Sequence, residues 1–165
     1  MSEAILDAGP LIHLAELDAL DVLSDFTSLY VPDAVWDEVT NYQSRALEHP
    51  KLKIKRLNAS ISSIALMALA QALTLDKGEI EALALLEGNP QALFLTDDTA
   101  ARLAAIQRGY TVHGKIGLLV RSVRQGLRTH QEVLALLNGL PQHSTLHIRP
   151  QLLDAIIKQL QDEWS

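Results

Sequence analysis

The stretch Ala4-Ile5-Leu6-Asp7-Ala8-Gly9-Pro10, close to the N-terminus, decides the fold. Its three apolar residues are followed at once by Asp7, and Gly9-Pro10 then ends the run. A short apolar run bounded by turn residues is typical of a buried strand. We therefore predict a first strand over 4–6, with Asp7 at its carboxyl end, and one or two short helices over 11–23.

Outward from this stretch, the chain alternates between the strand pattern and the helix pattern. Apolar and β-prone runs predict further strands over 28–31, 51–57, 92–96 and 110–113, the second of them near a sheet edge because it alternates with basic residues. Helical spacing and capping residues predict helices over 33–42, 60–73, 76–88, 97–107, 115–125, 129–138 and 149–162. Strands that alternate with helices pair in parallel, so we predict an α/β fold around a parallel central sheet.

Length and composition indicate a single globular domain. The 165 residues are 48 % hydrophobic, and we expect one domain over 1–165, in which a loop over 140–147 leads into a C-terminal helical extension, 141–165. Cysteine is absent, which excludes disulfides and cysteine-ligated zinc. The longest apolar stretch, 64–75, contains Gln71 and is shorter than the roughly 20 residues of a membrane span. With no signal-peptide pattern at the N-terminus, we expect a soluble, cytoplasmic protein without a membrane partner.

Acidic side chains recur where the predicted strands end, which is where parallel sheets bind ligands. They are Asp7 after the first strand, Glu38 in the helix after the second, Asp97 and Asp98 after Thr96 of the fourth, and Glu79 and Glu81 in the helix before it. Crowded carboxylates repel one another unless a cation neutralises them. Hard oxygen ligands suit Mg²⁺ or Mn²⁺, which can activate water for phosphodiester cleavage. The net charge of −6 excludes binding of nucleic acid through bulk positive charge, but it leaves metal-mediated contact open.

Each acid also has a structural interpretation that the residues leave open. Asp7 before Gly9-Pro10 could cap a helix, and Glu38 could be a solvated helix residue. Glu79 and Glu81 could complement the dipole of their helix. Either Asp97 or Asp98 could cap the following helix while the other faces the site. The case for a common site rests on the order of these acids along the chain.

Four stretches together resemble PIN domains: Ile5-Leu6-Asp7-Ala8-Gly9-Pro10-Leu11-Ile12, Val35-Trp36-Asp37-Glu38-Val39, Gly78-Glu79-Ile80-Glu81-Ala82-Leu83-Ala84-Leu85 and Leu95-Thr96-Asp97-Asp98. The later part of the chain resembles one bacterial and archaeal branch of the PIN-like superfamily. The residues that carry this second likeness are Ala101-Arg102, Gly114-x-x-Gly117-Leu118-Leu119, Gly126 and the terminal segment from Ile148-Arg149 to Leu160.

The resemblance implies a Rossmann-like three-layer sandwich with extra C-terminal helices, and Mg²⁺- or Mn²⁺-dependent cleavage of single-stranded RNA. Many such proteins are toxins of type II toxin–antitoxin pairs, often homodimers silenced by a small antitoxin protein. The residues carried over are Asp7, Glu38 and Asp98 as metal ligands, Asp97 as a ligand or water-positioning group, and Thr96 as a hydrogen-bond partner of the ligands. A PIN-like module with weak catalysis, which binds nucleic acid or a partner, is the alternative.

The third acidic position of the family falls on either Glu79 or Glu81. The sequence Glu81-Ala82-Leu83 aligns with the usual Asp-Ala-Leu and favours Glu81 as the catalytic residue, whereas Gly78-Glu79 is typical of this branch. The two residues are two positions apart, so they point in different directions on one helix. A glutamate is one methylene longer than the usual aspartate, which bears on the strength of catalysis.

Basic residues near the C-terminus suggest contacts with RNA backbone. Arg121, Arg124 and Arg128 are at helical spacing after Lys115, and they form a basic stripe if the helix continues through Gly126. A solvated helix face is the alternative. Arg102, one turn after Asp98, could orient a carboxylate, contact phosphate or form a structural ion pair.

Overall fold

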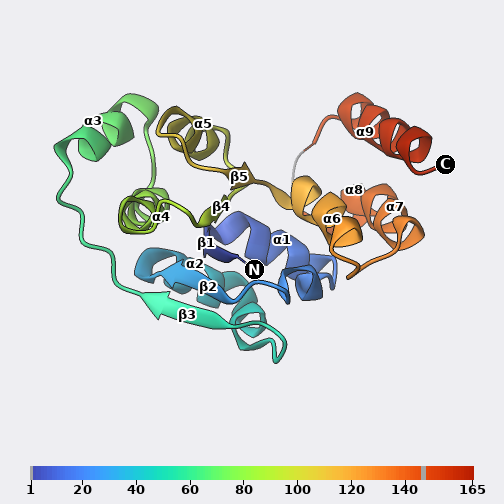
Figure 1. The fold of residues 1–165 in the computed structure, drawn as a ribbon, viewed down its shortest axis with the longest axis horizontal. Helices are drawn as coiled ribbons and strands as arrows, with labels where there is room; N and C mark the ends of the chain where they lie inside the picture. Colours follow the sequence, from blue (N-terminus) through green and yellow to red (C-terminus); the bar gives the residue numbers. More distant parts are fainter. Residues whose placement is uncertain (1, 146–147) are drawn as a thin grey trace.

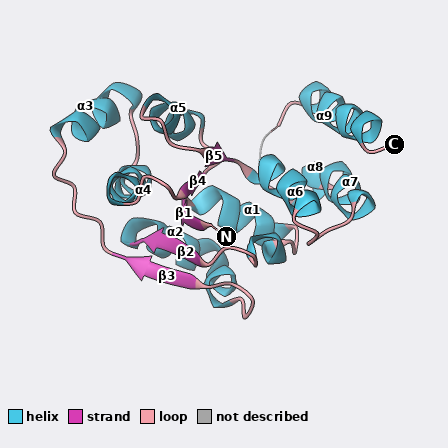
Figure 2. Ribbon diagram, viewed as in Figure 1, coloured by secondary structure: helices cyan, strands magenta, loops and turns pink. Residues whose placement is uncertain are grey.

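Five parallel strands form the central sheet of the structure, a computed structural model that describes residues 2–145 and 148–165 (Figures 1 and 2). The strand order is β3-β2-β1-β4-β5, and every pairing between neighbours is parallel. The bounds are β1 Glu3–Leu6, β2 Ser28–Pro32, β3 Ile54–Leu57, β4 Leu93–Leu95 and β5 Val112–His113. The predicted α/β fold with a parallel sheet is confirmed, and β3 lies at a sheet edge as expected.

Helices cover both faces of the sheet, because alternate residues of each central strand point to opposite sides. Ala4 and Leu6 of β1 are fully buried in one core, whereas Ile5 is fully buried in the other. The first core is closed by α1 Ala8–Glu16, α2 Asp33–Gln43 and α6 Lys115–Arg124, and the second by α3 Ile64–Leu73, α4 Lys77–Gly88 and α5 Thr99–Gln107. The result is the three-layer sandwich that the resemblance implied.

Capping residues set three helix starts that differ from the predictions. Helix α1 begins directly after Asp7 rather than at residue 11, because Pro10 lies in its first turn, where a backbone N–H is not needed. Helix α3 begins after its cap Ser63 instead of near residue 60. Helix α5 begins at Thr99 after its cap Asp98, two residues later than the predicted start at Asp97.

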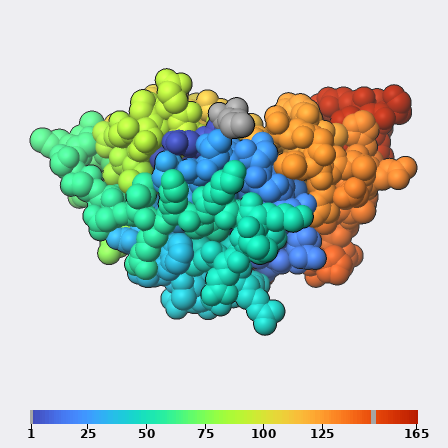
Figure 3. Space-filling model, turned by 60° about the horizontal axis from the view of Figure 1, so that its bottom comes forward, coloured from blue at the N-terminus to red at the C-terminus, as the bar shows by residue number. Residues whose placement is uncertain are grey.

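The C-terminal segment gathers at one end of the molecule, in orange and red in Figure 3, opposite the green α3. It contains α6, α7 His130–Asn138, α8 Leu140–His143 and α9 Pro150–Glu163. Leu153, Ile157 and Leu160 bury one face of α9 in the first core, together with Val133 of α7. The predicted loop over 140–147 is wrong at its start, where Pro141 takes an early helical position and opens α8. Residues 146–147 of that loop lie outside the described part of the chain.

Short 3-10 helices, η1 Leu20–Leu23 and η2 Ser44–Glu48, complete the connections. Along the described ranges 2–145 and 148–165, no helix combines the length and the apolar character needed to cross a bilayer.

The feature that matters for function is the sheet order. The chain proceeds outward from β1 to β3 and then returns to pair β4 with the other side of β1. The carboxyl ends of β1 and β4 are therefore a topological switch point, where open α/β sheets bind ligands.

Candidate functional site

Asp7 lies at the switch point and is held by three hydrogen bonds. Its backbone N–H donates to the carbonyl oxygen of Leu95 at 2.9 Å, which joins the ends of β1 and β4. Its Oδ1 accepts from the N–H of Ala8 at 2.9 Å, so it also acts as the cap of α1. Its Oδ2 accepts from the hydroxyl of the fully buried Thr96 at 2.8 Å. Thr96 thus takes the orienting position expected from the sequence, and Asp7 is 8 % exposed.

Asp97 and Asp98 follow β4 and have different partners. Asp98 Oδ2 accepts from the N–H of Ala101 at 2.9 Å, which makes Asp98 the cap of α5. Asp97 Oδ1 accepts from the N–H of Lys115 at 2.7 Å, while its Oδ2 is buried with no hydrogen-bond partner in the described part of the chain. Both aspartates line the same cavity as Asp7, so capping and lining do not exclude each other here.

Helix α4 presents Glu79 to the cavity and directs Glu81 elsewhere. Glu79 and the cap Asp76 form a capping box, in which Glu79 N–H donates to Asp76 Oδ1 at 2.8 Å and Asp76 N–H donates to Glu79 Oε1 at 3.1 Å. Glu79 is 5 % exposed, and its Oε2 has no partner among the described residues. Glu81 Oε1 accepts from the N–H of Ala34 at 3.0 Å, in the first turn of α2. Glu81, which the sequence favoured as the third acid, does not line the cavity.

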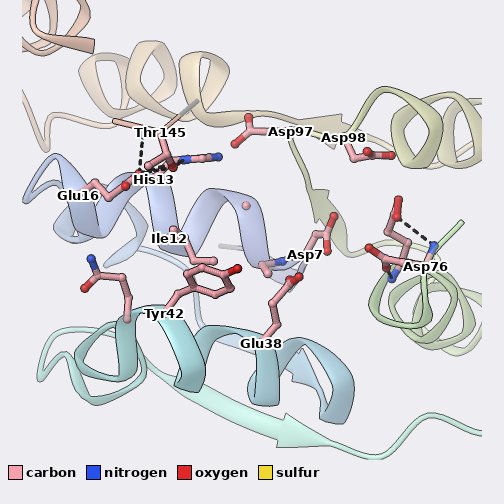
Figure 4. Close-up of a pocket in the computed structure, with 14 residues that line it drawn as sticks. Asp7, Ile12, His13, Glu16, Glu38, Tyr42, Asp76, Asp97, Asp98 and Thr145 are labelled. Carbon is pink, nitrogen blue, oxygen red and sulfur yellow. Dashed lines mark hydrogen bonds and ion pairs between the residues drawn. The ribbon is translucent and has the colours of Figure 1, made fainter. Parts of the chain in front are cut away.

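An open cavity of about 660 Å³ collects these side chains, as Figure 4 shows. Helix α2 contributes Glu38 to it. We call it the acidic cavity after the carboxylates that line its central part: Asp7, Glu38, Asp76, Glu79, Asp97 and Asp98. Asp76 was missed in the sequence analysis. The signal for it was the Asp-x-x-Glu capping pattern over 76–79, since this pattern brings both of its acids to one helix end.

Burial and mutual repulsion raise the pKa of several of these acids. Burial raises the pKa of Asp7 from 3.8 to about 6, although the hydrogen bonds from Thr96 and Ala8 oppose the effect. Burial, followed by the nearby carboxyl group of Asp98, raises the pKa of Glu79 to about 9. The pKa of Glu38 is also raised, first by burial and then by the charge of Asp76. The cavity is therefore a region where negative charge is costly until a cation compensates for it.

The donor chemistry of the acidic cavity suits a hard divalent cation. It offers carboxylate oxygens, and the unpartnered Oδ2 of Asp97 and Oε2 of Glu79 are buried oxygens that lack a donor in the described structure. As the side chains stand, no three His, Asp or Glu residues within 2–145 and 148–165 form a group close enough to hold a metal ion. A cation in this cavity would draw the carboxylates together.

The basic stripe predicted near the C-terminus does not form. Helix α6 ends at Arg124, and Gly126 takes a φ of +74°, so no helix continues to Arg128. Arg121 is 7 % exposed, and it binds both oxygens of Asp25 at 2.9 and 2.5 Å. Arg128 binds both oxygens of Asp21, while Lys115 is fully buried, with its Nζ donating to Ser144. The predicted continuous stripe of Lys115, Arg121, Arg124 and Arg128 is wrong, because the helix ends before Gly126, Lys115 is buried and acids distant in sequence pair with Arg121 and Arg128. Contact of the exposed Arg124 with RNA stays a prediction.

Arg102 approaches the acidic cavity across Gly114. A Cβ added at Gly114 would lie 2.9 Å from Arg102 Nη1 and 2.9 Å from Asp97 Oδ1, so both side chains meet the backbone at this glycine. A residue larger than glycine would displace Asp97 from the position where Lys115 N–H holds it. Arg102 thus lies near Asp97, an acid of the site. This position agrees with a role in orienting the Asp97 carboxylate or in contacting a phosphate bound beside it.

The comparison with known families agrees with the geometry. A family model described as a PIN domain (DUF3368) matches residues 3–162, which includes β1 to β5 and almost all of α9. No curated protein matches the chain. A match of this extent covers every acid of the cavity and the C-terminal helices alike. The chain therefore belongs to the PIN-domain family, whose members are generally nucleases.

Proposed function

We propose that this PIN domain is an endoribonuclease that cleaves single-stranded RNA with Mg²⁺ or Mn²⁺. The observation that carries the proposal is the convergence of six carboxylates on one cavity at the switch point of the sheet. A cluster of buried carboxylates with raised pKa values costs the fold stability unless it has a role, and a bound divalent cation would offset the repulsion between them. A bound cation activates water and stabilises the charge that develops on a phosphodiester.

Residues of the acidic cavity would hold such a cation. Asp7 is fixed by Thr96 and by Ala8 N–H, so its carboxylate has little freedom to rotate away. Asp97 and Glu79 each use one oxygen in a hydrogen bond to backbone N–H and leave the other without a partner. The unpartnered oxygens would take the cation, and the other carboxylates would move toward it, because no three of the described His, Asp and Glu residues are close enough to hold a metal ion as they stand.

Glu79 takes the third acidic position in this proposal, in place of Glu81. Only Glu79 of the two lines the acidic cavity. Glu81 contributes indirectly, since its hydrogen bond to Ala34 N–H holds the start of α2, the helix that carries Glu38. Glu81 is therefore a positioning residue.

The proposal extends to a biological role. The branch of the superfamily that this sequence resembles supports a toxin of a type II toxin–antitoxin pair, with a homodimeric assembly and a small antitoxin protein as partners. Light scattering of the purified protein tests the homodimer. Growth arrest on expression, relieved by the product of a small neighbouring gene, tests the toxin role.

The nuclease itself is tested with labelled single-stranded RNA and Mn²⁺. We expect the wild-type protein to cleave, and Glu79→Gln and Glu38→Gln to lose about a hundredfold or more of the rate. Asp37→Asn is the matched control, because Asp37 adjoins Glu38 on α2 but does not line the cavity. RNA binding without cleavage by the wild type, even in saturating Mn²⁺, would instead support a catalytically weak binding module, and equal rates for all four proteins would contradict the proposed site.

A further inference from the structure

The acidic cavity has a second end, which extends beyond the six carboxylates of its central part. Figure 4 shows this end at the left, away from Asp76 and Asp98 at the right. Helices α1 and α2 contribute most of its lining, and Thr145, which follows α8, contributes the rest. We call it the side lobe, and its residues are Ile12, His13, Glu16, Tyr42, Gln43 and Thr145.

An aromatic ring stands at the opening of the side lobe. Tyr42 follows Glu38 by four residues on α2, so the two side chains project from the same face of the helix into one cavity. The Tyr42 residue is 74 % exposed, which leaves its ring open to a ligand. Ile12 of α1 lies beside the ring in Figure 4 and supplies an apolar surface. A flat aromatic molecule that stacks on Tyr42 and rests on Ile12 would cover both surfaces.

Polar groups of fixed orientation form the rim of the lobe. Glu16 Oε1 accepts from the backbone N–H of Thr145 at 3.1 Å and from its hydroxyl at 3.0 Å, and it pairs with His13 Nδ1 at 3.1 Å. This pairing occupies one ring nitrogen of His13 and leaves Nε2 to meet a ligand. Gln43 adds an amide that can both donate and accept.

The side lobe adjoins the acids directly. A Cβ added at Gly9 would lie 3.5 Å from Asp97 Oδ2 and 3.8 Å from His13 Cδ2, so both side chains lie close to this glycine. A ligand could therefore contact His13 while a group attached to it reaches Asp97. The whole cavity, at about 660 Å³, falls within the range of about 300–1,000 Å³ that is usual for small-molecule sites.

We infer that the side lobe is a nucleobase subsite, which binds one unstacked base of a single strand while the adjoining phosphate lies at the acids. A base has a π-face for Tyr42, an apolar edge for Ile12, and donors and acceptors for His13 and Gln43. In a duplex each base stays stacked and paired, so a duplex would not fill the lobe. This inference rests on the proposed nuclease function and assigns the contact with the base of its single-stranded substrate to named residues of the side lobe.

The test uses single-stranded hexanucleotides of RNA that carry 2-aminopurine at one position, and a matched strand that lacks the base at that position. Ca²⁺, which takes the same oxygen ligands, replaces Mn²⁺ during the binding measurement. We expect the wild-type protein to quench 2-aminopurine fluorescence and to bind the base-free strand about tenfold more weakly. Tyr42→Ala should lose the quenching and bind the complete strand about tenfold more weakly, while Tyr42→Phe should retain both. Asn41→Ala, an exposed neighbour on α2 outside the cavity, is the matched control.

Two results separate the subsite from the nuclease. If the wild-type protein cleaves RNA with Mn²⁺ but binds complete and base-free strands equally, the nucleobase subsite is overturned and the proposed nuclease stands. If the wild-type protein neither binds metal nor cleaves RNA, the nuclease proposal fails first, and the subsite fails with it. The comparison of the two strands needs no variant, so a folding defect in Tyr42→Ala would not obscure the outcome.

Discussion

Replacement of Asp7 by asparagine should stabilise the metal-free protein. Burial raises the pKa of Asp7 from 3.8 to about 6, so the folded state holds a proton more tightly than the unfolded chain does. The stabilisation of the folded state by this tighter proton binding is fully present below pH 3.8 and is lost as the pH rises through about 6. At about 1.36 kcal/mol for each pH unit between the two pKa values, ionised Asp7 costs the folded state about 3 kcal/mol at pH 8.

Asparagine removes this charge without removing the hydrogen bonds. Its carbonyl oxygen can accept from Ala8 N–H, and its amide can donate to the hydroxyl of Thr96, which is able to reverse its role. In EDTA at pH 8, we therefore expect Asp7→Asn to raise the free energy of unfolding by about 1–3 kcal/mol, with a gain below about 1 kcal/mol at pH 4. With saturating Mn²⁺ the order should reverse, because the cation stabilises the wild type through binding and the variant lacks a ligand.

Urea unfolding, followed by the fluorescence of Trp36 and Trp164 between pH 4 and 8, measures these differences. Asp37→Asn serves as the control, since the Asp37 side chain is 71 % exposed and its replacement should change the stability by less than about 0.5 kcal/mol. A metal-free Asp7→Asn protein that is less stable than the wild type at pH 8 would refute the reasoning. Such a result would mean that hydrogen bonding to the carboxylate outweighs the cost of burying its charge.

Three further predictions follow from the same structure. The affinity for Mn²⁺ should increase between pH 6 and 9, because the pKa values of Asp7 and Glu79 are raised to about 6 and about 9 and cation binding displaces their protons. Calorimetric titration measures this affinity, and an affinity independent of pH would contradict the prediction. Gly114→Ala should lower the free energy of unfolding in urea by about 1–3 kcal/mol, since the new Cβ would lie 2.9 Å from Asp97 Oδ1 and 3.3 Å from the Thr96 carbonyl oxygen. Gly88→Ala, whose Cβ meets nothing within 4 Å, should not destabilise the fold. Arg121→Ala should lower the free energy of unfolding by about 2 kcal/mol, because it leaves Asp25 without this partner and removes the contact with the Phe26 ring. Replacement of the exposed Arg124 by alanine should leave the stability unchanged. Equal unfolding midpoints for the two variants would argue against the structural role of Arg121.

Local patterns in the sequence were sufficient for the architecture. The apolar run before Asp7 predicts β1, because strand formation depends on the alternation and length of apolar residues over a few positions. The alternation of strands with helices predicts the parallel sheet, since connections of this length are right-handed crossovers. Asp7, Asp97 and Asp98 could be assigned to the carboxyl ends of neighbouring strands for the same reason, because Asp7 follows the first predicted strand and the Asp97-Asp98 pair follows the fourth. Helix starts were predicted less well where two capping residues competed, as at Ser60 and Ser63.

The choice between Glu79 and Glu81 depended on long-range packing. Both glutamates are buried, and the sequence near them favours neither on physical grounds. Glu81 is directed to Ala34 because α4 packs against the start of α2, 47 residues earlier in the chain. The C-terminal arginines are a second case: Asp25 and Asp21, which bind Arg121 and Arg128, are 96 and 107 residues away. Helical spacing predicts which side chains share a face, but the partner of that face is set by tertiary contacts. The side chains that meet in the acidic cavity and its side lobe come from helices and strands that approach one another only in the folded protein.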